Sequence, residues 1–228
     1  GDAPRGARAG VDLDKMPGAK FFPDAKLNFA ENLLRPGRRN VDPTSSAIIF
    51  QGEDKVSEKM TWDQLEKAVS RTAQALAESG VGKGDRVAGI VANSPETIVA
   101  MLATTSLGAV WSSCSPDFGV QGILDRFGQI EPKVLFVVDG YYYGGKSLSV
   151  VAKAQEVLAS LPTVKSTIIL PYLSKVKDEP VSNISQLRSA VTYAEFIKPH
   201  KAAPIKFAQV SFNDPLYIMF SSGTTGRG

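Results

Sequence analysis

Short apolar runs alternate along most of the chain with stretches in which apolar residues keep helical spacing. The apolar runs, which are typical of buried strands, occupy 86–92, 109–113, 133–138 and 164–170. Apolar residues recur every three or four positions in 61–80, 95–107, 120–130 and 149–161. Strands separated by helices of this length need crossover connections. The pattern therefore predicts an α/β fold with a mainly parallel sheet flanked by helices.

Two of the predicted helices begin with recognisable capping sequences. Thr61 and Gln64 have the spacing of a capping box in front of the first helical stretch. Ser94 followed by Pro95 is typical of an N-cap and a first helical residue, and Gly108 is a stop signal for the helix that follows. We therefore expect Thr61 and Ser94 to cap these two helices.

Smaller elements are predicted before this alternation begins. Asn28, with Glu31 three residues later, predicts a short helix that runs to about Leu34. The segments 47–50 and 55–60 flank a Gly-Glu-Asp turn, which predicts a β-hairpin.

The chain is interpreted as two parts that meet near residue 40. Residues 1–20 contain glycine, proline, alanine and charge without periodicity, so 1–40 is interpreted as an N-terminal arm and lead-in segment. The α/β alternation occupies the second part, 41–228. Within it the pattern weakens over 171–201, which indicates a surface connection with one short helix at 192–197.

Composition and charge exclude several classes of protein. Hydrophobic residues make up 43% and charged residues 21% of the 228 residues, which is ordinary for a globular protein. The net charge of +3 comes with no basic stripe, which argues against nucleic acid as a partner. Cys114 is the single cysteine, which excludes an internal disulfide and fits a reducing compartment. The apolar runs fall far short of the roughly 20 residues that span a bilayer, so we expect a cytoplasmic protein without a membrane span.

The last apolar run leads into a segment of hydroxyl and glycine residues. The run 216–220 predicts a short buried strand, and it is followed by Ser221, Ser222, Gly223, Thr224, Thr225 and Gly226. Glycines let backbone N–H groups turn toward one point, and hydroxyls add donors without bulk, a combination that suits phosphate oxygens. The pattern is not the P-loop, because its lysine and its first glycine are missing. On residue types alone, a flexible connector is the alternative.

After a hydrophobic strand, Ser221 to Gly226 resembles the phosphate-binding loop of the adenylate-forming enzymes, which include acyl-CoA synthetases, peptide-synthetase adenylation domains and luciferases. The segments 21–34, 111–119 and 124–133 resemble the acyl-CoA synthetases that activate short acids. The resemblance covers nearly everything from residue 20 to residue 226. It implies that the α/β fold is the first part of the large N-terminal domain of such an enzyme.

Beyond the loop the sequence departs from the family. The family continues with one variable residue and then Pro-Lys, whereas Arg227 and Gly228 follow here. The resemblance thus implies an incomplete AMP-binding domain that ends at the phosphate loop. The family's catalytic lysine, its magnesium-linked glutamate and its adenine and ribose motifs have no match in this sequence. We therefore expect no catalytic residue and no metal ligand in the chain, and we expect the chain alone to be inactive.

The resemblance also implies a reaction with acetoacetate, ATP, magnesium and CoA. The acid's carboxylate would attack the α-phosphorus of ATP and expel pyrophosphate, and the CoA thiol would then displace AMP. Ser221 to Gly226 would hold the ATP phosphates. Two alternatives stay open: a ligase for acetate, propionate or another short acid, and a non-catalytic nucleotide-binding module.

A second phosphate contact is implied by 139–146, which resembles a turn that brings basic side chains to the phosphates of CoA in short-chain acyl-CoA synthetases. Lys146 matches one basic position and would act as a point charge there. Tyr143 stands where a second base is expected. A solvated lysine in a glycine-rich turn is the alternative, and both interpretations stay open.

Other residues that could carry chemistry have plainer explanations. Cys114 lies in a predicted strand far in sequence from His200, the single histidine, so we expect a buried structural thiol. One cysteine and one histidine offer no zinc-ligand spacing. Asp117 is interpreted as the cap of the helix that begins at Val120.

The remaining polar candidates are interpreted as surface or packing residues. Asp125 and Glu131 fall on a charged helix and at its end, where solvated side chains are usual. Tyr141, Tyr142 and Tyr143 are interpreted as a partly buried aromatic turn rather than as a stacking surface for a base.

Overall fold

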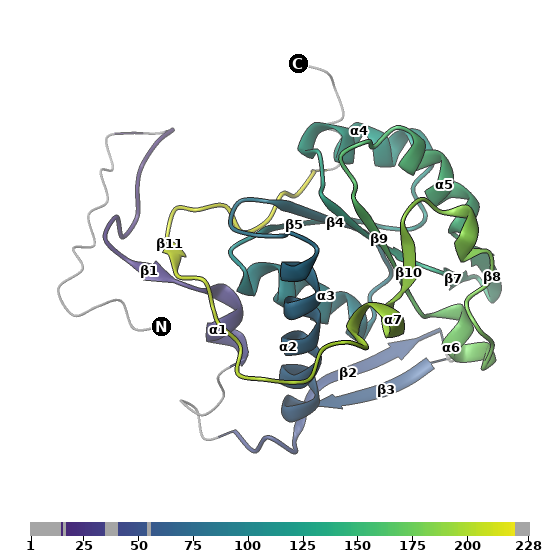
Figure 1. Ribbon diagram of the computed structural model, residues 1–228, viewed down its shortest axis with the longest axis horizontal. Coiled ribbons are helices and arrows are strands. Elements are labelled where there is room, and N and C mark those ends of the chain that lie inside the picture. The colour runs from purple at the N-terminus through teal and green to yellow at the C-terminus, as the bar shows by residue number, and fades with distance from the viewer. Residues whose placement is uncertain (1–14, 16, 35–40, 54–55, 222–228) are drawn as a thin grey trace.

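The computed structural model describes residues 15, 17–34, 41–53 and 56–221. Within these residues a five-stranded sheet lies at the centre, in the order β10-β9-β6-β4-β5, and every neighbouring pair is parallel (Figure 1). The mainly parallel α/β sheet that the sequence predicts is therefore confirmed. Its strands are β4 (Arg86–Ile90), β5 (Val110–Cys114), β6 (Val134–Val138), β9 (Ser166–Leu170) and β10 (Ala190–Thr192).

Helices cover both faces of this sheet. The apolar residues of α1, α2, α3 and α7 join one core, and those of α4 and α5 join the core on the opposite face. The helices are α1 (Phe29–Leu34), α2 (Trp62–Glu78), α3 (Pro95–Ser106), α4 (Val120–Ile130), α5 (Val151–Ala159), α6 (Leu173–Lys177) and α7 (Tyr193–Ile197), with a 3₁₀ turn at Ile184–Gln186.

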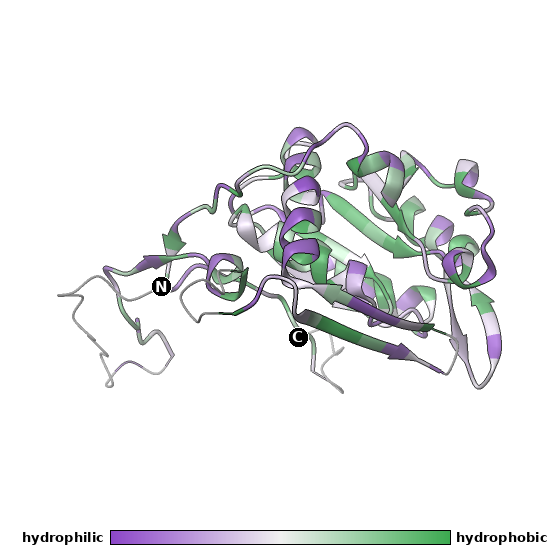
Figure 2. Ribbon diagram, turned by 90° about the horizontal axis from the view of Figure 1, so that it is seen from below, coloured by the Kyte–Doolittle hydropathy of each residue, from purple (hydrophilic) through white to green (hydrophobic). Residues whose placement is uncertain are grey.

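Each strand feeds both cores, because successive side chains of a strand point to opposite faces. In β6, Val134 and Phe136 pack with the α2 and α3 core, whereas Leu135 and Val137 pack with the α4 and α5 core. All of β6 is buried, as expected for a central parallel strand covered on both sides. Figure 2 shows the hydrophobic strands between helices whose outer surfaces are polar.

Three two-stranded antiparallel sheets lie around the central sheet. The predicted hairpin is confirmed as β2 (Ser46–Gly52) and β3 (Val56–Thr61). The pairing of β1 (Lys26–Leu27) with β11 (Val210–Ser211) was not predicted, nor was the hairpin of β7 (Gly140–Tyr143) and β8 (Lys146–Ser149). The tyrosine segment, predicted to be a turn, is therefore a strand.

Thr61 and Ser94 both occupy the N-cap positions that the sequence predicts, but they differ in what their side chains do. Thr61 and Gln64 make both bonds of a capping box, at 2.9 and 3.2 Å. Ser94 occupies the N-cap of α3, but its side chain makes no capping hydrogen bond. The N–H of Thr97 donates instead to the backbone carbonyl of Ser94, at 3.1 Å, so this donor is already satisfied.

The stretch 171–201 contains more structure than its weak pattern indicates. The short helix predicted at 192–197 is confirmed as α7, which begins with a capping box of Thr192 and Glu195. The strand β10 and the helix α6 were not predicted, because they are only 3 and 5 residues long and show no clear periodicity.

Candidate functional site

A cleft of about 320 Å³ lies at the carboxyl ends of the parallel strands. We call it the carboxyl-edge cleft. Segments that follow four different strands line it: 91–93 and Thr97 after β4, 113–117 after β5, Tyr141 and Tyr142 after β6, and Tyr172 after β9. Residues far apart in sequence therefore meet here because parallel strands end at the same edge.

The strand order explains why a cleft forms at this place. The chain passes from β4 to β5 on one side and then returns to place β6 on the other side of β4. Connections leave the sheet in opposite directions at such a switch point and leave a crevice between them. Open α/β sheets bind ligands in that crevice, outside the carboxyl ends of the strands.

Helix N-termini give this edge a positive electrostatic character. The helices α3, α4 and α5 all begin here, and none of the three has a side-chain cap. The ammonium of Lys153 donates to the carbonyl of Pro116 at 2.6 Å, which holds the 113–117 wall and brings a cation beside it. Helix N-termini and cations favour anionic groups, so this edge suits a phosphorylated ligand.

Cys114 lies at the end of β5 and lines the cleft as a buried thiol, as predicted. Burial raises its pKa to about 12, and the positive charges of Arg126 and Lys153 offset only part of that effect. Because the thiolate is the nucleophilic form, this side chain is an inert wall residue at neutral pH.

Asp117 is not the helix cap that the sequence suggests, because Gly119 occupies the N-cap of α4. Its carboxylate instead accepts a hydrogen bond from the Ser115 hydroxyl, at 3.3 Å, and interacts with Tyr141. Burial raises the pKa of Tyr141 to about 12, and hydrogen bonding to Asp117 and its negative charge act in the same direction. The phenol therefore stays protonated and can donate a hydrogen bond in the cleft.

The segment before the predicted phosphate loop lies beside β5. Trp111 forms a parallel bridge with Tyr217: its N–H donates to Leu216 O at 3.1 Å, and its carbonyl accepts from Ile218 N–H at 2.9 Å. The hydroxyl of Ser112 donates to Ile218 O at 2.8 Å. Because the segment runs parallel to β5, the chain reaches Ser221 at the carboxyl edge of the sheet.

The prediction of a buried strand at 216–220 is nevertheless wrong. The pairing is one isolated bridge, and Met219 is 85% exposed. Among the described residues this segment has a sheet neighbour on its β5 side alone, so the ladder does not extend. Of the six predicted loop residues the structure describes Ser221, which is exposed, whereas Ser222, Gly223, Thr224, Thr225 and Gly226 lie outside the described residues.

An arginine packs against the residue that precedes the loop. The guanidinium carbon of Arg126 lies 4.4 Å from the centre of the Phe118 ring and 5.8 Å from that of Phe220. Such cation–π contacts fix both a ring and a charge. Arg126 therefore links the wall of the cleft to the start of the predicted loop, a role that the sequence did not indicate.

Lys146, the predicted CoA contact, is exposed in the β7–β8 hairpin and pairs with Tyr143 in the ladder. Tyr143 is 64% exposed, whereas Tyr141 and Tyr142 are half-buried and reach the cleft. The prediction of partly buried aromatics thus holds for Tyr141 and Tyr142. The hairpin places a lysine on the element that carries two of the cleft's tyrosines.

The other rejected candidates lie outside the cleft lining. The imidazole of His200 lies 3.0 Å from the carboxylate of Glu78, and Asp125 accepts a hydrogen bond from Gln121 at 2.7 Å. Glu131 ends α4 in a left-handed conformation, with φ of 49°. Each has a role in local structure, in agreement with the interpretation from sequence.

A second cleft, of about 390 Å³, opens at the opposite edge of the sheet and is lined by Asp85, Arg86, Glu131, Lys133, Pro162, Thr163 and Lys165. We call it the amino-edge cleft. This cleft is larger than the carboxyl-edge cleft, but its main charged side chains already have partners. Lys133 donates to Asp85 at 2.6 Å, and Arg86 donates to Ile130 O at 2.5 Å. Its main charges hold the fold together, so it is the weaker candidate.

Asp139 and Tyr172 were missed by the sequence reasoning. Asp139 directly follows the apolar run of β6, a position at which polar residues of parallel sheets often act. Its partners, however, are backbone amides of residues 172–174, which no local pattern connects to it.

Two searches of the described residues bear on other classes of site. In that part of the chain no cluster of three or more His, Cys, Asp or Glu side chains has the arrangement of a metal site. No helix there has the length and apolar character needed to cross a membrane.

Comparison with known proteins agrees with this geometry. Residues 38–228 match the family of AMP-binding enzymes. The acetoacetyl-coenzyme A synthetase of Rhizobium meliloti (strain 1021) is 52% identical over 221 residues, which cover 97% of this chain and 32% of the relative. The malonamoyl-CoA synthetase of Penicillium aethiopicum is 37% identical over 212 residues, which cover 92% of this chain and 29% of the relative.

A solved structure gives the same result. Acetoacetyl-CoA synthetase from Streptomyces lividans superposes with a TM-score of 0.81 at 38% identity, covering 92% of this chain and 31% of that one. The chain thus spans about a third of the length of the relatives that it matches.

Proposed function

The chain belongs to the family of AMP-binding enzymes, and on that premise we propose that it forms part of an acetoacetate–CoA ligase. Acetoacetate would attack the α-phosphorus of ATP and release pyrophosphate, and the CoA thiol would then attack the acetoacetyl-adenylate and release AMP. The observation that carries this proposal is the 52% identity to an acetoacetyl-coenzyme A synthetase over 97% of the chain. We also propose a cytoplasmic location for this ligase.

We assign the ATP phosphates to Ser221, Ser222, Gly223, Thr224, Thr225 and Gly226. The parallel bridge between Trp111 and Tyr217 supports this, because it brings the chain to the carboxyl edge just before these residues. Their backbone N–H groups and hydroxyls would spread the charge of the departing pyrophosphate. Magnesium enters bound to ATP, as part of the substrate.

We assign the nucleotide part of CoA to the carboxyl-edge cleft and its rim. The uncapped starts of α3, α4 and α5 favour its phosphates, and the half-buried rings of Tyr141 and Tyr142 offer apolar surface beside them. Lys146 is exposed on the hairpin that carries these tyrosines and would act as a mobile point charge for a phosphate.

A specific alternative exists for the identity of the substrate acid. The similarity to a malonamoyl-CoA synthetase favours, as a second candidate, a ligase for a related three-carbon acid. Both acids carry a carbonyl β to the carboxylate, so the chemistry of activation is the same for each.

The test is to follow the reading frame past Gly228 and to assay its continuous product with acetoacetate, malonamate, acetate and propionate. We expect CoA-dependent AMP formation to be fastest with acetoacetate. Faster turnover of malonamate would support the second candidate, and faster turnover of acetate would contradict both. The 228-residue chain by itself should show no acid-dependent exchange between ATP and pyrophosphate.

A further inference from the structure

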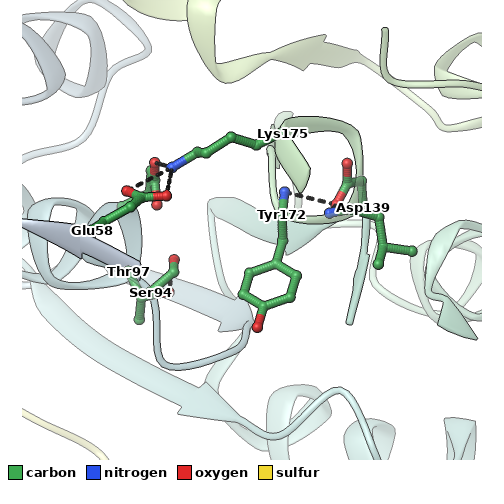
Figure 3. Close-up of polar contacts among 8 residues, drawn as sticks. Glu58, Ser94, Thr97, Asp139, Tyr172 and Lys175 are labelled. Carbon is green, nitrogen blue, oxygen red and sulfur yellow. Dashed lines mark hydrogen bonds and ion pairs between the residues drawn. The ribbon is translucent and has the colours of Figure 1, made fainter. Parts of the chain in front are cut away.

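Asp139 is a buried carboxylate between β6 and the β7–β8 hairpin, with 7% of the residue exposed. One carboxylate oxygen accepts from the backbone N–H groups of Tyr172, at 2.9 Å, and Leu173, at 2.8 Å, and the other accepts from that of Ser174, at 2.9 Å. Figure 3 shows the carboxylate directed at this backbone. These amides lie at the start of α6, so Asp139 caps this helix from a position between β6 and β7, more than thirty residues earlier.

The backbone of Asp139 adds two further connections. Its N–H donates to Leu170 O at the end of β9, at 3.0 Å, and its carbonyl accepts from Val150 N–H, at 3.3 Å. Val150 lies just past the end of the hairpin, so this second bond closes the base of the hairpin. One residue therefore joins β9, the start of α6 and the hairpin that carries Lys146.

The next residue permits this junction because it is glycine. A Cβ atom at Gly140 would collide with the Leu173 side chain and with the carbonyl oxygen of Leu148. The hairpin strand β8 and the first turn of α6 thus approach the backbone at 140 closely from two sides. The Asp139–Gly140 pair fixes how the hairpin and α6 lie relative to each other.

The far side of α6 is anchored as well. Lys175 forms ion pairs with Glu58 of β3, at 2.7 Å, and with Glu96 in the first turn of α3, at 2.5 Å (Figure 3). Tyr172 lies directly before α6 and packs its ring near those of Phe50 and Tyr142, with centroids 6.2 and 6.4 Å away. These contacts therefore hold α6 in place and fix the position of Tyr172 in the cleft.

We propose that Asp139 is a positioning residue for the carboxyl-edge cleft: its carboxylate sets Tyr172 and the hairpin with Lys146 in the arrangement that receives CoA. This rests on the proposed function of the cleft. A helix cap that serves stability alone is the plain alternative. The two differ in ligand affinity, because a cap needed for stability alone leaves the affinity of the fully folded protein unchanged.

The experiment measures CoA binding by the continuous product of the reading frame in a calorimetric titration, at a temperature at which circular dichroism shows each variant to be fully folded. Asp139→Ala should weaken CoA binding about tenfold and increase amide exchange at residues 172–174 and 140–149. Asp139→Asn keeps an acceptor for two of the amides, so its affinity should lie between those of Asp139→Ala and the wild type. Asp178→Asn, at the exposed left-handed end of α6, is the matched control and should bind like wild type.

The outcomes separate the two claims. Wild-type CoA affinity in folded Asp139→Ala or, should that variant fail to fold, in Asp139→Asn would overturn the positioning role and leave the proposed function intact. Absence of CoA binding by the wild-type continuous product would overturn the assignment of the cleft to CoA, and the positioning role with it. An equal loss of affinity in Asp178→Asn would also overturn the inference, because the effect would then not be specific to Asp139.

Discussion

The two edges of the central sheet use the ends of the same helices in opposite ways. Crossover helices run antiparallel to the strands, so their C-termini gather at the amino edge, where they leave carbonyl groups without helical partners. Side-chain donors bind these carbonyls: Asn28 donates to Thr105 O and Ser106 O, at 3.0 and 3.1 Å, and Arg86 donates to Ile130 O. At the amino edge, side chains of the chain itself therefore satisfy these helix C-terminal carbonyls.

At the carboxyl edge three helices begin without a side-chain cap at their N-cap residue. These helices are α3, α4 and α5, and they begin at the edge that holds the carboxyl-edge cleft, whose walls contain tyrosine and serine. Two helices at this edge do have caps: Asp139 binds the first amides of α6, and Thr192 and Glu195 form the capping box of α7. Polar side chains at the amino edge therefore bind the ends of helices, whereas three helices at the carboxyl edge begin without such partners at their N-caps.

The largest expected effect tests the closure of the amino edge at Asn28. Its buried side chain donates to three carbonyls, at 2.8 to 3.1 Å, and Asn28→Ala leaves them without these donors. We expect the free energy of unfolding to fall by about 3 kcal/mol in urea denaturation. Asn213→Ala, which removes bonds to exposed Phe21, is the control and should cost less than about 1 kcal/mol. Equal losses of stability in the two variants would show that the burial of the Asn28 hydrogen bonds adds nothing to their contribution.

The next effect concerns the tight junction at the carboxyl edge. Gly140→Ala places a methyl group against Leu173 and the Leu148 carbonyl, and should lower the free energy of unfolding by about 2 kcal/mol. The control is Gly128→Ala, in an exposed helical position with open space around it, which should stabilise the chain by up to about 1 kcal/mol. Guanidinium denaturation of both variants checks the difference in sign. A neutral Gly140→Ala would mean that the hairpin moves freely relative to α6.

A smaller effect is expected at the ion pair of the amino edge. Burial raises the pKa of Asp85, but the hydrogen bonds and charge of Lys133 and the N–H of Gly82 outweigh it and hold the pKa below 3.8. This contribution is complete above pH 3.8 and is lost as the pH falls through the lowered value. Lys133→Met should lower the free energy of unfolding by about 1 kcal/mol at pH 7. It should also reduce how steeply that free energy falls at acid pH, which is the acid limb of its pH dependence.

Denaturation at several pH values checks this prediction. Lys67→Met, which removes a more exposed pair with Asp63, is the control and should leave the acid limb unchanged. An unaltered acid limb in Lys133→Met would show that the pair with Asp85 does not hold the edge closed.

The smallest expected effect tests which edge of the sheet binds CoA. Lys146→Gln should weaken CoA binding about threefold, as expected for an exposed charge pair, without a change in stability. Lys165→Gln, in the amino-edge cleft, should leave CoA affinity unchanged. An NMR titration of both variants decides, and a larger loss in Lys165→Gln would reverse the assignment of the two edges.

Much of the fold was predictable because local patterns encode it. The helix α4 has the predicted limits, and the capping boxes at Thr61 and Thr192 mark the starts of α2 and α7. The likeness to adenylate-forming enzymes, drawn from short segments, is confirmed by the match over residues 38–228. These features depend on residues a few positions apart, which a sequence displays directly.

The errors share a physical cause. Asp117 has the residue type of a cap, but Gly119 occupies the N-cap of α4, and Asp117 has a partner in Tyr141 of β7. The apolar run 216–220 has the composition of a strand, but a ladder needs neighbours, and among the described residues it has β5 alone. Residue type sets what a side chain can do, and its surroundings set what it does.

By itself, the sequence determined the parallel α/β fold, the family and the residue types of the predicted phosphate loop, because periodicity, capping sequences and motifs are local. Tertiary structure alone decided which residues line the cleft at each edge of the sheet. It brought Asp139 to the amides of Tyr172 to Ser174, and Lys133 to Asp85. Partners separated by tens of residues leave no periodic signal, since chain packing, and not local spacing, brings them together.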